Sequence, residues 1–163
     1  MRTRLAIVDD AAVIAAIYNQ GIEDRVGTFE TRLRAPDEVA DWIASAHPVV
    51  VAEVDGGVVA FAATFPYRSR PCYAGVAECS VYVARDRRGR GAGRRVLATL
   101  VSEAERAGFW KLVSRLFVEN TASRALVRAA GFREVGVYEK HGRLDGVWRD
   151  VVIVERLIPG NLQ

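Results

Sequence analysis

The chain has 163 residues, of which 50% are hydrophobic and 26% are charged, and its formal net charge is +3 at pH 7. Because this is the composition of an ordinary globular chain, we expect residues 1–163 to form a single domain. Two cysteines are too few for a disulfide framework, and no hydrophobic run reaches the roughly 20 residues that cross a bilayer, so we expect a cytoplasmic protein without a membrane partner.

The N-terminal third predicts one strand and two helices. Residues 3–7 alternate weakly, as a strand does, and Asp9 or Asp10 then caps a helix whose hydrophobic residues recur on one face. Residues 19–31 show no hydrophobic periodicity, so no element is predicted there. A second helix is predicted over residues 36–46, because a proline and two acidic residues occupy its first turn.

A β-hairpin is predicted next. Two β-branched runs, residues 49–54 and 58–65, are separated by Asp-Gly-Gly at 55–57, which is the composition of a hairpin turn. A polar loop over residues 66–75 leads to another strand at 76–83.

The C-terminal half alternates helices and strands. We expect a helix over 91–108, a strand over 111–118, a helix that starts between Asn120 and Ser123 and ends at Gly131, and a closing hairpin of 133–138 and 147–157. The order βααβββαβαββ predicts an α/β (α+β) fold, with a mixed, mostly antiparallel sheet and helices on both faces.

The segment RGRGAGR at residues 88–94 follows the 76–83 strand and opens a helix. Glycines let a backbone approach a phosphate closely, and the N–H groups of a helix start favour an anion. The glycines at 89, 91 and 93 do not fit the dinucleotide pattern, and no P-loop motif is present. Arginines surround the segment: Arg85, Arg87, Arg88, Arg90, Arg94 and Arg95. A local anion site is favoured over a nucleic-acid surface, with a solvated turn as the plainer alternative.

The Arg-Gly-rich segment resembles the acetyl-CoA signature of the GNAT superfamily of N-acetyltransferases, and Asn-Thr-Ala-Ser at 120–123 with Gly-Phe at 131–132 resembles the second cofactor segment of that superfamily. This resemblance covers nearly the whole chain. It implies a GNAT-like sheet that splays between the 76–83 and 111–118 strands, acetyl-CoA as co-substrate and no metal. It implies cofactor contacts from Val81, Tyr82, Val83, Arg88, Gly89, Arg90, Gly91, Ala92, Gly93, Arg94, Asn120 and Ser123.

Three further segments resemble the phosphinothricin and arsinothricin N-acetyltransferase branch: Tyr18-Asn19 with residues 29–31, the strand 76–83, and Trp-Arg-Asp-Val at 148–151. Members of that branch acetylate the α-amino group of glutamate analogues that carry a phosphinic, arsinic or sulfoximine group. The resemblance therefore implies a small amino-acid-like substrate. It also implies a homodimer, for which the hydrophobic residues 151–154 are the support within the sequence.

Glu78 is the candidate general base. A protonated amine cannot attack a thioester until it loses a proton, so a carboxylate beside the cofactor suits the reaction. Glu78 shares a strand face with Ser80 and Tyr82 and matches the carboxylate of the resembled branch. The alternative is a solvated glutamate paired with one of the many arginines.

Arg68 and Arg70 are candidates for substrate binding, because two guanidiniums can clamp an anionic group. The alternative is a pair of ordinary surface arginines. Phe29 is a candidate pocket wall, and the alternative for it is simple packing.

His141 is a candidate catalytic residue, because its Lys-His-Gly triplet resembles one in phosphinothricin acetyltransferases whose histidine is considered catalytic. It departs from that pattern in standing seven residues before Trp148, with a long predicted turn between them. Val127 occupies the position where many GNAT enzymes carry a proton-donating tyrosine. Either the CoA thiolate leaves without a dedicated acid, or Tyr138 is the substitute donor. Cys79, on the strand face opposite Glu78, is interpreted as a core residue and not as a nucleophile.

Three other functions remain open. The first is acetylation of a protein N-terminus or another small amine, the second is a non-catalytic acyl-CoA-binding domain, and the third is nucleic-acid binding through the arginine cluster.

Overall fold

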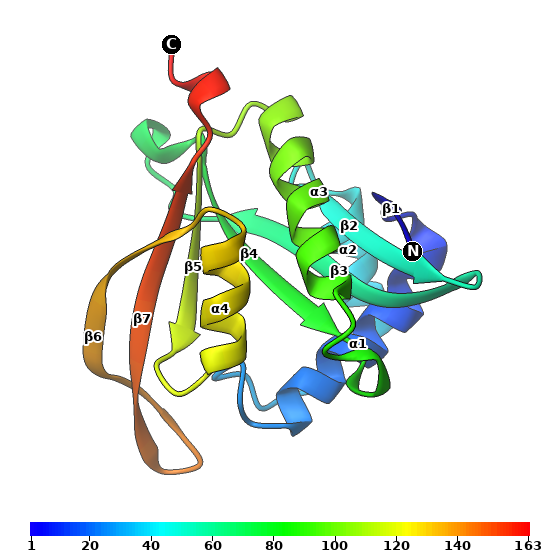
Figure 1. The fold of residues 1–163 in the computed structure, drawn as a ribbon, viewed down its shortest axis with the longest axis horizontal. Coiled ribbons are helices and arrows are strands. Elements are labelled where there is room, and N and C mark those ends of the chain that lie inside the picture. Colours follow the sequence, from blue (N-terminus) through cyan, green and yellow to red (C-terminus); the bar gives the residue numbers. More distant parts are fainter.

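A seven-stranded sheet in the order β1-β2-β3-β4-β5-β7-β6 runs through the middle of the computed structural model, which describes residues 1–163 (Figure 1). The strands are β1 (Arg2–Leu5), β2 (Val49–Val54), β3 (Gly57–Pro66), β4 (Val76–Val83), β5 (Lys111–Phe117), β6 (Arg133–Leu144) and β7 (Val147–Leu157). The helices are α1 (Ala11–Glu23), α2 (Pro36–Ala44), α3 (Ala92–Arg106) and α4 (Thr121–Ala129). This is the predicted order of elements, and the predicted mixed, mostly antiparallel sheet is confirmed, since only β4 and β5 pair in parallel.

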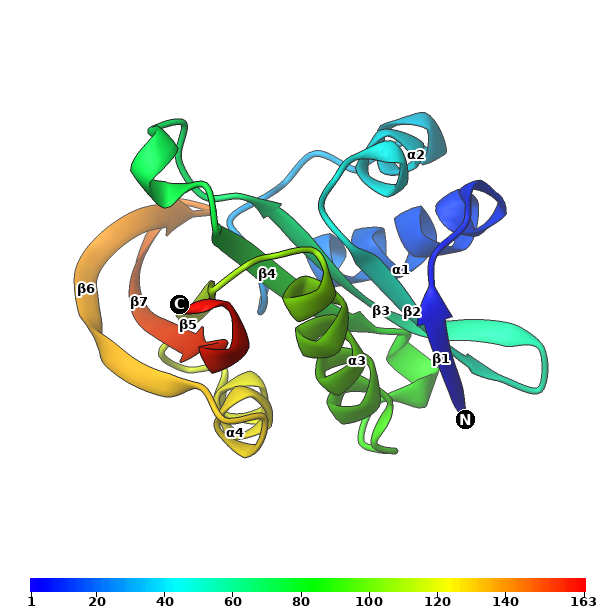
Figure 2. The same cartoon turned by 90° about the horizontal axis from the view of Figure 1, so that it is seen from above.

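Helices cover both faces of the sheet, with α1 and α2 on one side and α3 and α4 on the other (Figure 2). The strand β2 shows why both layers are needed. Val50 and Ala52 face the cluster built on α3, whereas Val49 and Val51 face the cluster built on α1 and α2. Since successive side chains of a strand point to opposite faces, a continuous hydrophobic run is buried on both sides.

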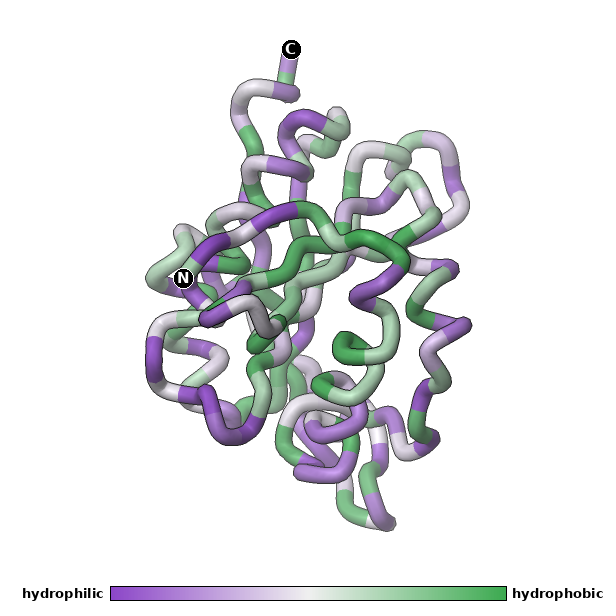
Figure 3. The backbone as a smooth tube through the Cα atoms, turned by 90° about the vertical axis from the view of Figure 1, so that its right-hand side faces the viewer, coloured by the Kyte–Doolittle hydropathy of each residue, from purple (hydrophilic) through white to green (hydrophobic).

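The hydrophobic segments run through the middle of the molecule, and the hydrophilic ones gather in the outer turns (Figure 3). None of the helices is long and hydrophobic enough to span a membrane.

The strands β4 and β5 part after three paired positions, the last of which joins Glu78 to Val113. Beyond this point β4 continues to Val83 and β5 to Phe117, and the two strands diverge (Figure 1). The predicted splay is confirmed, and it opens the sheet between its two halves.

The two hairpin turns are shorter than predicted. Asp55 and Gly56 alone connect β2 to β3, with φ of 52° and 80°. Asp145 and Gly146 likewise connect β6 to β7, with φ of 49° and 78°. Two consecutive residues with positive φ form the tight turn whose twist matches the paired strands.

The strand β6 is therefore longer than the predicted 133–138, and its pairing shifts register between Tyr138 and Gly142. Lys140 lies in this irregular stretch with φ of 47°, and its N–H donates to Asp150 Oδ1 at 2.7 Å. Residues 133–141 are all exposed, so they carry no hydrophobic period by which the strand could be predicted to its end.

Asp10 is the N-cap residue of α1, as predicted, but its side chain makes no capping hydrogen bond to that helix. Asp10 is buried and its Oδ2 accepts from the Ile7 N–H at 2.8 Å, which closes a 3₁₀ turn before α1. Arg4 donates to both carboxylate oxygens of Asp10, at 2.7 and 3.0 Å, and also donates to Glu53 on β2. The first strand accordingly ends at Leu5 and not at residue 7.

We expect Asp10→Asn to lower the free energy of unfolding by about 2 kcal/mol at pH 7, because it removes a charge-assisted pair in a buried site. Hydrogen bonds from Arg4 hold the pKa of Asp10 below its usual range. A carboxyl whose pKa is lower in the folded than in the unfolded chain contributes stability above about pH 4, and that contribution is lost as the pH falls further. Urea denaturation at pH 7 and pH 3 checks this.

The matched control is Asp9→Asn, which changes an exposed neighbour. A gap in stability between Asp10→Asn and the unchanged protein that stays constant down to pH 3 would contradict the assignment.

Candidate functional site

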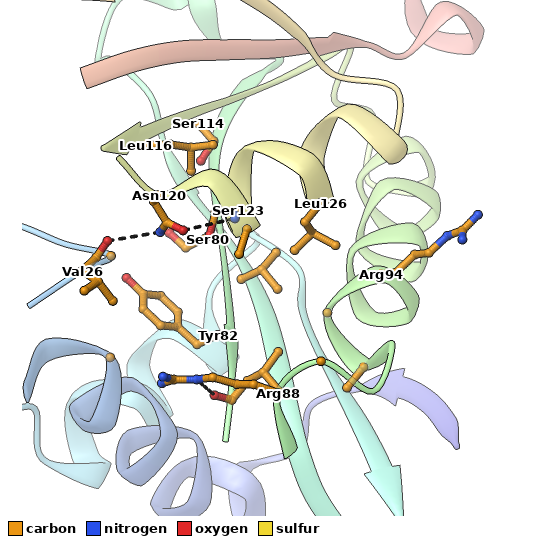
Figure 4. A pocket seen from close by; sticks show the side chains of 18 of the residues that line it. Val26, Ser80, Tyr82, Arg88, Arg94, Ser114, Leu116, Asn120, Ser123 and Leu126 are labelled. Atoms are coloured by element: carbon orange, nitrogen blue, oxygen red, sulfur yellow. Dashed lines mark hydrogen bonds between the residues drawn. The ribbon is translucent and has the colours of Figure 1, made fainter. Parts of the chain in front are cut away.

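A cavity of about 450 Å³ lies in the splay between β4 and β5 (Figure 4). Its walls come from the end of α1 and the segment after it, from β4, from the Arg-Gly-rich segment with the first turn of α3, from β5, and from α4. The residues predicted to contact a cofactor line it, with the exception of Arg90: Val81, Tyr82, Val83, Arg88, Gly89, Gly91, Ala92, Gly93, Arg94, Asn120 and Ser123.

The Arg-Gly-rich segment forms the end of the cavity at the start of α3. Gly89 and Gly91 have φ of 73° and 85°, which favours glycine at both positions, and Gly91 is the N-cap of α3. A Cβ on Gly93 would lie 3.2 Å from Leu126 Cδ2, so this glycine lets α3 and α4 approach each other. The first turn of α3 lines the cavity, and its N–H groups have no partner within the helix. This end of the cavity is suited to an anion.

The arginines of this segment have different partners. Arg88 Nη2 lies 2.7 Å from Asp24 Oδ2, and Arg85 donates to the same carboxylate through Nη2 at 2.7 Å. Hydrogen bonds from Arg85 and Arg88 lower the pKa of Asp24. Arg94 forms no hydrogen bond or ion pair with the protein and extends outward from α3 (Figure 4). Arg85 and Arg88 thus tie the segment to the end of α1, whereas Arg94 is available to a ligand.

The backbone of β4 is exposed to the splay at Val81 and Val83. The Ala84 N–H donates to Val59 O of β3, and alternate residues of a strand direct their polar groups to opposite neighbours. Val81 and Val83 therefore direct their backbone N–H and C=O groups away from β3, into the splay. The Tyr82 ring packs against Tyr18 of α1 at a centroid distance of 4.9 Å.

Asn120 joins two walls of the cavity. Its Oδ1 accepts from the Ser123 N–H at 3.1 Å, which caps α4, and its Nδ2 donates to Val26 O at 3.1 Å (Figure 4). The predicted helix start is confirmed. The bond to Val26 could not be predicted, since it connects segments far apart in the sequence.

Glu78 lies at the closed end of the splay, where the pairing of β4 with β5 stops. Arg115 of β5 donates to Glu78 Oε1, and no protein group donates to Oε2. Arg115 lines the cavity and Glu78 does not. Sequence reasoning missed Arg115, for which the signal was one arginine in an otherwise mainly hydrophobic half-strand.

Arg68 and Arg70 lie together in the loop between β3 and β4, where they line a second hollow of about 430 Å³ with Ser69 and Tyr73. Neither guanidinium has an ion pair with the protein, and neither lines the splay cavity. The loop starts close to the base candidate, because Phe65 of β3 pairs with Glu78.

Phe29 packs edge-on against Phe117 at 4.8 Å and lies over Gly142, where a Cβ would come within 2.9 Å of its ring. His141 and Tyr138, with ring centroids 4.7 Å apart, lie on the exposed edge strand β6 and outside the cavity. Their catalytic roles remain predictions.

Cys79 is buried on the opposite face of β4, as predicted. Burial raises the pKa of its thiol to about 12, so the thiol is protonated at neutral pH. This favours the interpretation of Cys79 as a core residue.

We expect Asn120→Ala to lower the free energy of unfolding by about 1 kcal/mol, because the N-cap acceptor is lost. Asn120→Asp is the matched variant, because it keeps the acceptor for Ser123 but loses the donor to Val26. Its free energy of unfolding should fall between those of the unchanged protein and Asn120→Ala. Urea denaturation gives the order, and an aspartate variant as unstable as the alanine variant would show that the cap contributes little.

Comparison with known proteins identifies the family. Residues 15–132 match the acetyltransferase (GNAT) family. The chain is 35% identical to the phosphinothricin N-acetyltransferase of Alcaligenes faecalis, over 91% of this chain and 78% of that protein. It is 30% identical to the L-methionine sulfoximine/L-methionine sulfone acetyltransferase of Salmonella typhimurium, over 95% of this chain and 93% of that protein.

Among solved structures, a phosphinothricin acetyltransferase from Sinorhizobium meliloti in complex with acetyl-CoA has a TM-score of 0.89 and 28% identity, over 96% of this chain and 88% of that one. The splayed sheet, the glycine-rich helix start and these similarities agree: the chain belongs to the GNAT family of N-acetyltransferases and is similar over most of its length to phosphinothricin and methionine sulfoximine acetyltransferases.

Proposed function

We propose that this protein is a cytoplasmic enzyme that uses acetyl-CoA to acetylate the α-amino group of a small amino-acid analogue of the phosphinothricin, arsinothricin or methionine sulfoximine type. The observation that carries the proposal is a cavity with an anion-binding helix start at one end and Arg115 in its wall, where Arg115 binds the carboxylate of Glu78 at the closed end of the splay. The similarity to enzymes named for such substrates supports it.

The residues present fit acetyl-CoA. The glycines at 89, 91 and 93 leave room at the start of α3, where unpaired N–H groups suit a pyrophosphate. The Val81 C=O and the Val83 N–H suit the amides of pantetheine, which would pair with them as an added strand does, whereas the Val83 C=O accepts from Arg88 Nε. Asn120 and Ser123 contribute the wall on the α4 side. Acetyl-CoA supplies a thioester, whose acetyl group is open to attack by a neutral amine.

Glu78 takes the proton from the substrate ammonium, directly or through a water. Its Oε2 has no protein donor and is available for this proton, while Arg115 holds Oε1. The Val81 N–H faces the splay and is the donor we assign to the negative charge that develops on the carbonyl oxygen. Val127 is buried against the main core and cannot donate a proton, so a thiolate leaves without a dedicated acid, or Tyr138 serves as the donor.

Arg68 and Arg70 bind the distal phosphinic, arsinic or sulfoximine group of the substrate in this proposal. Both guanidiniums are free of protein carboxylates, and the loop that carries them begins next to the β3 residue that pairs with Glu78. Phe29 packs on Phe117 at the end of β5 and is assigned the hydrophobic wall of the substrate site in this proposal.

We expect Glu78→Gln to lower kcat/KM by about 10²- to 10⁴-fold, the usual contribution of a general base. Release of free CoA thiol from acetyl-CoA is measured with phosphinothricin, arsinothricin and methionine sulfoximine. Glu103→Gln is the matched control, since Glu103 is also paired with an arginine but lies toward the far end of α3.

An undiminished rate in Glu78→Gln would place the base elsewhere. Turnover of N-terminal peptides, with none of the three analogues acetylated, would replace the proposed substrate class with protein N-termini. Cofactor binding without any turnover would indicate an acyl-CoA-binding domain.

We further propose that the protein is a homodimer formed along β6. The hydrophobic residues of β7 that suggested an interface, among them Val151 and Val154, are buried within the chain, which corrects that part of the argument. The edge strand β6 instead exposes Val135, Val137 and Tyr138 by about half. An exposed hydrophobic edge strand is a surface that proteins normally cover.

We expect light scattering at micromolar concentration to give the mass of two chains, and Val137→Glu to give the mass of one, because a charge would have to be buried in the interface. Val8→Glu changes another exposed hydrophobic residue, outside β6, and is the control. A single-chain mass for the unchanged protein would exclude the dimer.

A further inference from the structure

Arg115 is a charged residue in the splay that the proposed mechanism uses only to hold Glu78. Its side chain is 47% exposed and it lines the cavity. Its one hydrogen bond to the protein runs from Nη2 to Glu78 Oε1. A guanidinium has five N–H donors in a planar fork, so the donors on Nε and Nη1 are without a protein acceptor.

The sheet register explains why this pair lies where it does. Glu78 pairs with Val113, and Arg115 follows two residues later on the same face of β5, just past the point where the strands part. A carboxylate and a guanidinium are thereby held side by side at the closed end of the splay. A salt bridge that contributed only to stability could lie anywhere on the surface, whereas this one includes the proposed general base and lies at the closed end of the splay.

We propose that Arg115 binds the α-carboxylate of the substrate and forms, with Glu78, a receptor for the α-ammonium and α-carboxylate of one amino acid. This inference rests on the proposed function. An α-amino acid carries both charges on a single carbon, in the opposite sense to the Glu78–Arg115 pair. The free donors of Arg115 bind the substrate carboxylate while Nη2 stays on Glu78, since one guanidinium can serve two carboxylates.

The substrate class follows from this pairing. A free carboxylate next to the amine is required, and a protein N-terminus lacks it, because an amide takes its place. Arg68 and Arg70, in their separate hollow, are then left for the distal group. The two sites together fit a molecule that is an α-amino acid at one end and carries an anionic or other hydrogen-bond-accepting group at the other.

Arg149 provides an internal comparison. It lies on the same face of the sheet, two residues before Val151 of β7, with its guanidinium 5.6 Å from the Phe117 ring centroid. Its Nε is buried without a hydrogen-bond partner. It does not contact Glu78, so truncation of Arg149 removes a guanidinium from the same face without touching the proposed receptor.

The test compares methionine sulfoximine with its α-carboxamide, which differs from it only at the carboxylate. Kinetic constants are measured for the unchanged enzyme and for Arg115→Ala, Arg115→Lys and Arg149→Ala. We expect Arg115→Ala to raise KM for the acid on the order of 10- to 100-fold, the worth of a charge-assisted hydrogen bond, and to change KM for the carboxamide little. Arg115→Lys should recover part of the loss, because it keeps the charge without the fork. Unchanged acetyl-CoA affinity shows that each variant is folded.

Three results would overturn the inference: equal use of acid and carboxamide by the unchanged enzyme, an equal loss on both substrates in Arg115→Ala, or a selective loss on the acid in Arg149→Ala instead. If the unchanged enzyme acetylates neither compound, the proposed function fails for this substrate, and calorimetric titration of the CoA-bound protein with methionine sulfoximine decides the inference separately. Binding that is lost in Arg115→Ala upholds the carboxylate site, and absence of binding to the unchanged protein overturns it.

Discussion

The parting of β4 and β5 after Glu78 and Val113 is the constraint from which the cavity follows. Two strands that stop pairing leave backbone N–H and C=O groups without partners, and such groups must be satisfied when they are buried. Ser114 Oγ donates to Cys79 O at 2.8 Å, and Arg88 Nε donates to Val83 O at 3.2 Å. Side chains thus take the place of the missing ladder at both ends, and the backbone groups of Val81 and the Val83 N–H are left for a ligand that can pair with a strand.

Two helices begin at the edge of this opening, and the first N–H groups of each have no acceptor within their own helix. The helix α3 starts at Gly91 in a left-handed conformation, and α4 starts at Asn120 with a side-chain cap. The first turns of both line the cavity. Their N–H groups and the positive ends of their dipoles therefore act on the same space, which favours an extended ligand with phosphate groups.

The arginines divide into those that hold the protein together and those that are free to bind ligands. Arg85 and Arg88 share Asp24, and Arg4 joins Asp10 to Glu53, so these guanidiniums connect elements distant in sequence. Arg115 does both, since it binds Glu78 through one donor and also lines the cavity. The net charge of +3 thus says little about partners, because ion pairing decides which cations remain available.

The order of elements, the glycine-rich helix start, the Asn120 cap and the burial of Cys79 were predictable from the sequence, because each depends on hydrophobic periodicity or on residues within one turn. The partner of Glu78 was not predictable, since Arg115 lies 37 residues further along the chain and is brought to Glu78 by the register of β4 and β5. The same holds for the bond from Asn120 to Val26 and for the separate hollow of Arg68 and Arg70. The full length of β6 was also missed, because an exposed edge strand carries no hydrophobic pattern. The local sequence pattern determined the helices and strands. The pairing of strands distant in sequence decided which charged side chains lie in contact.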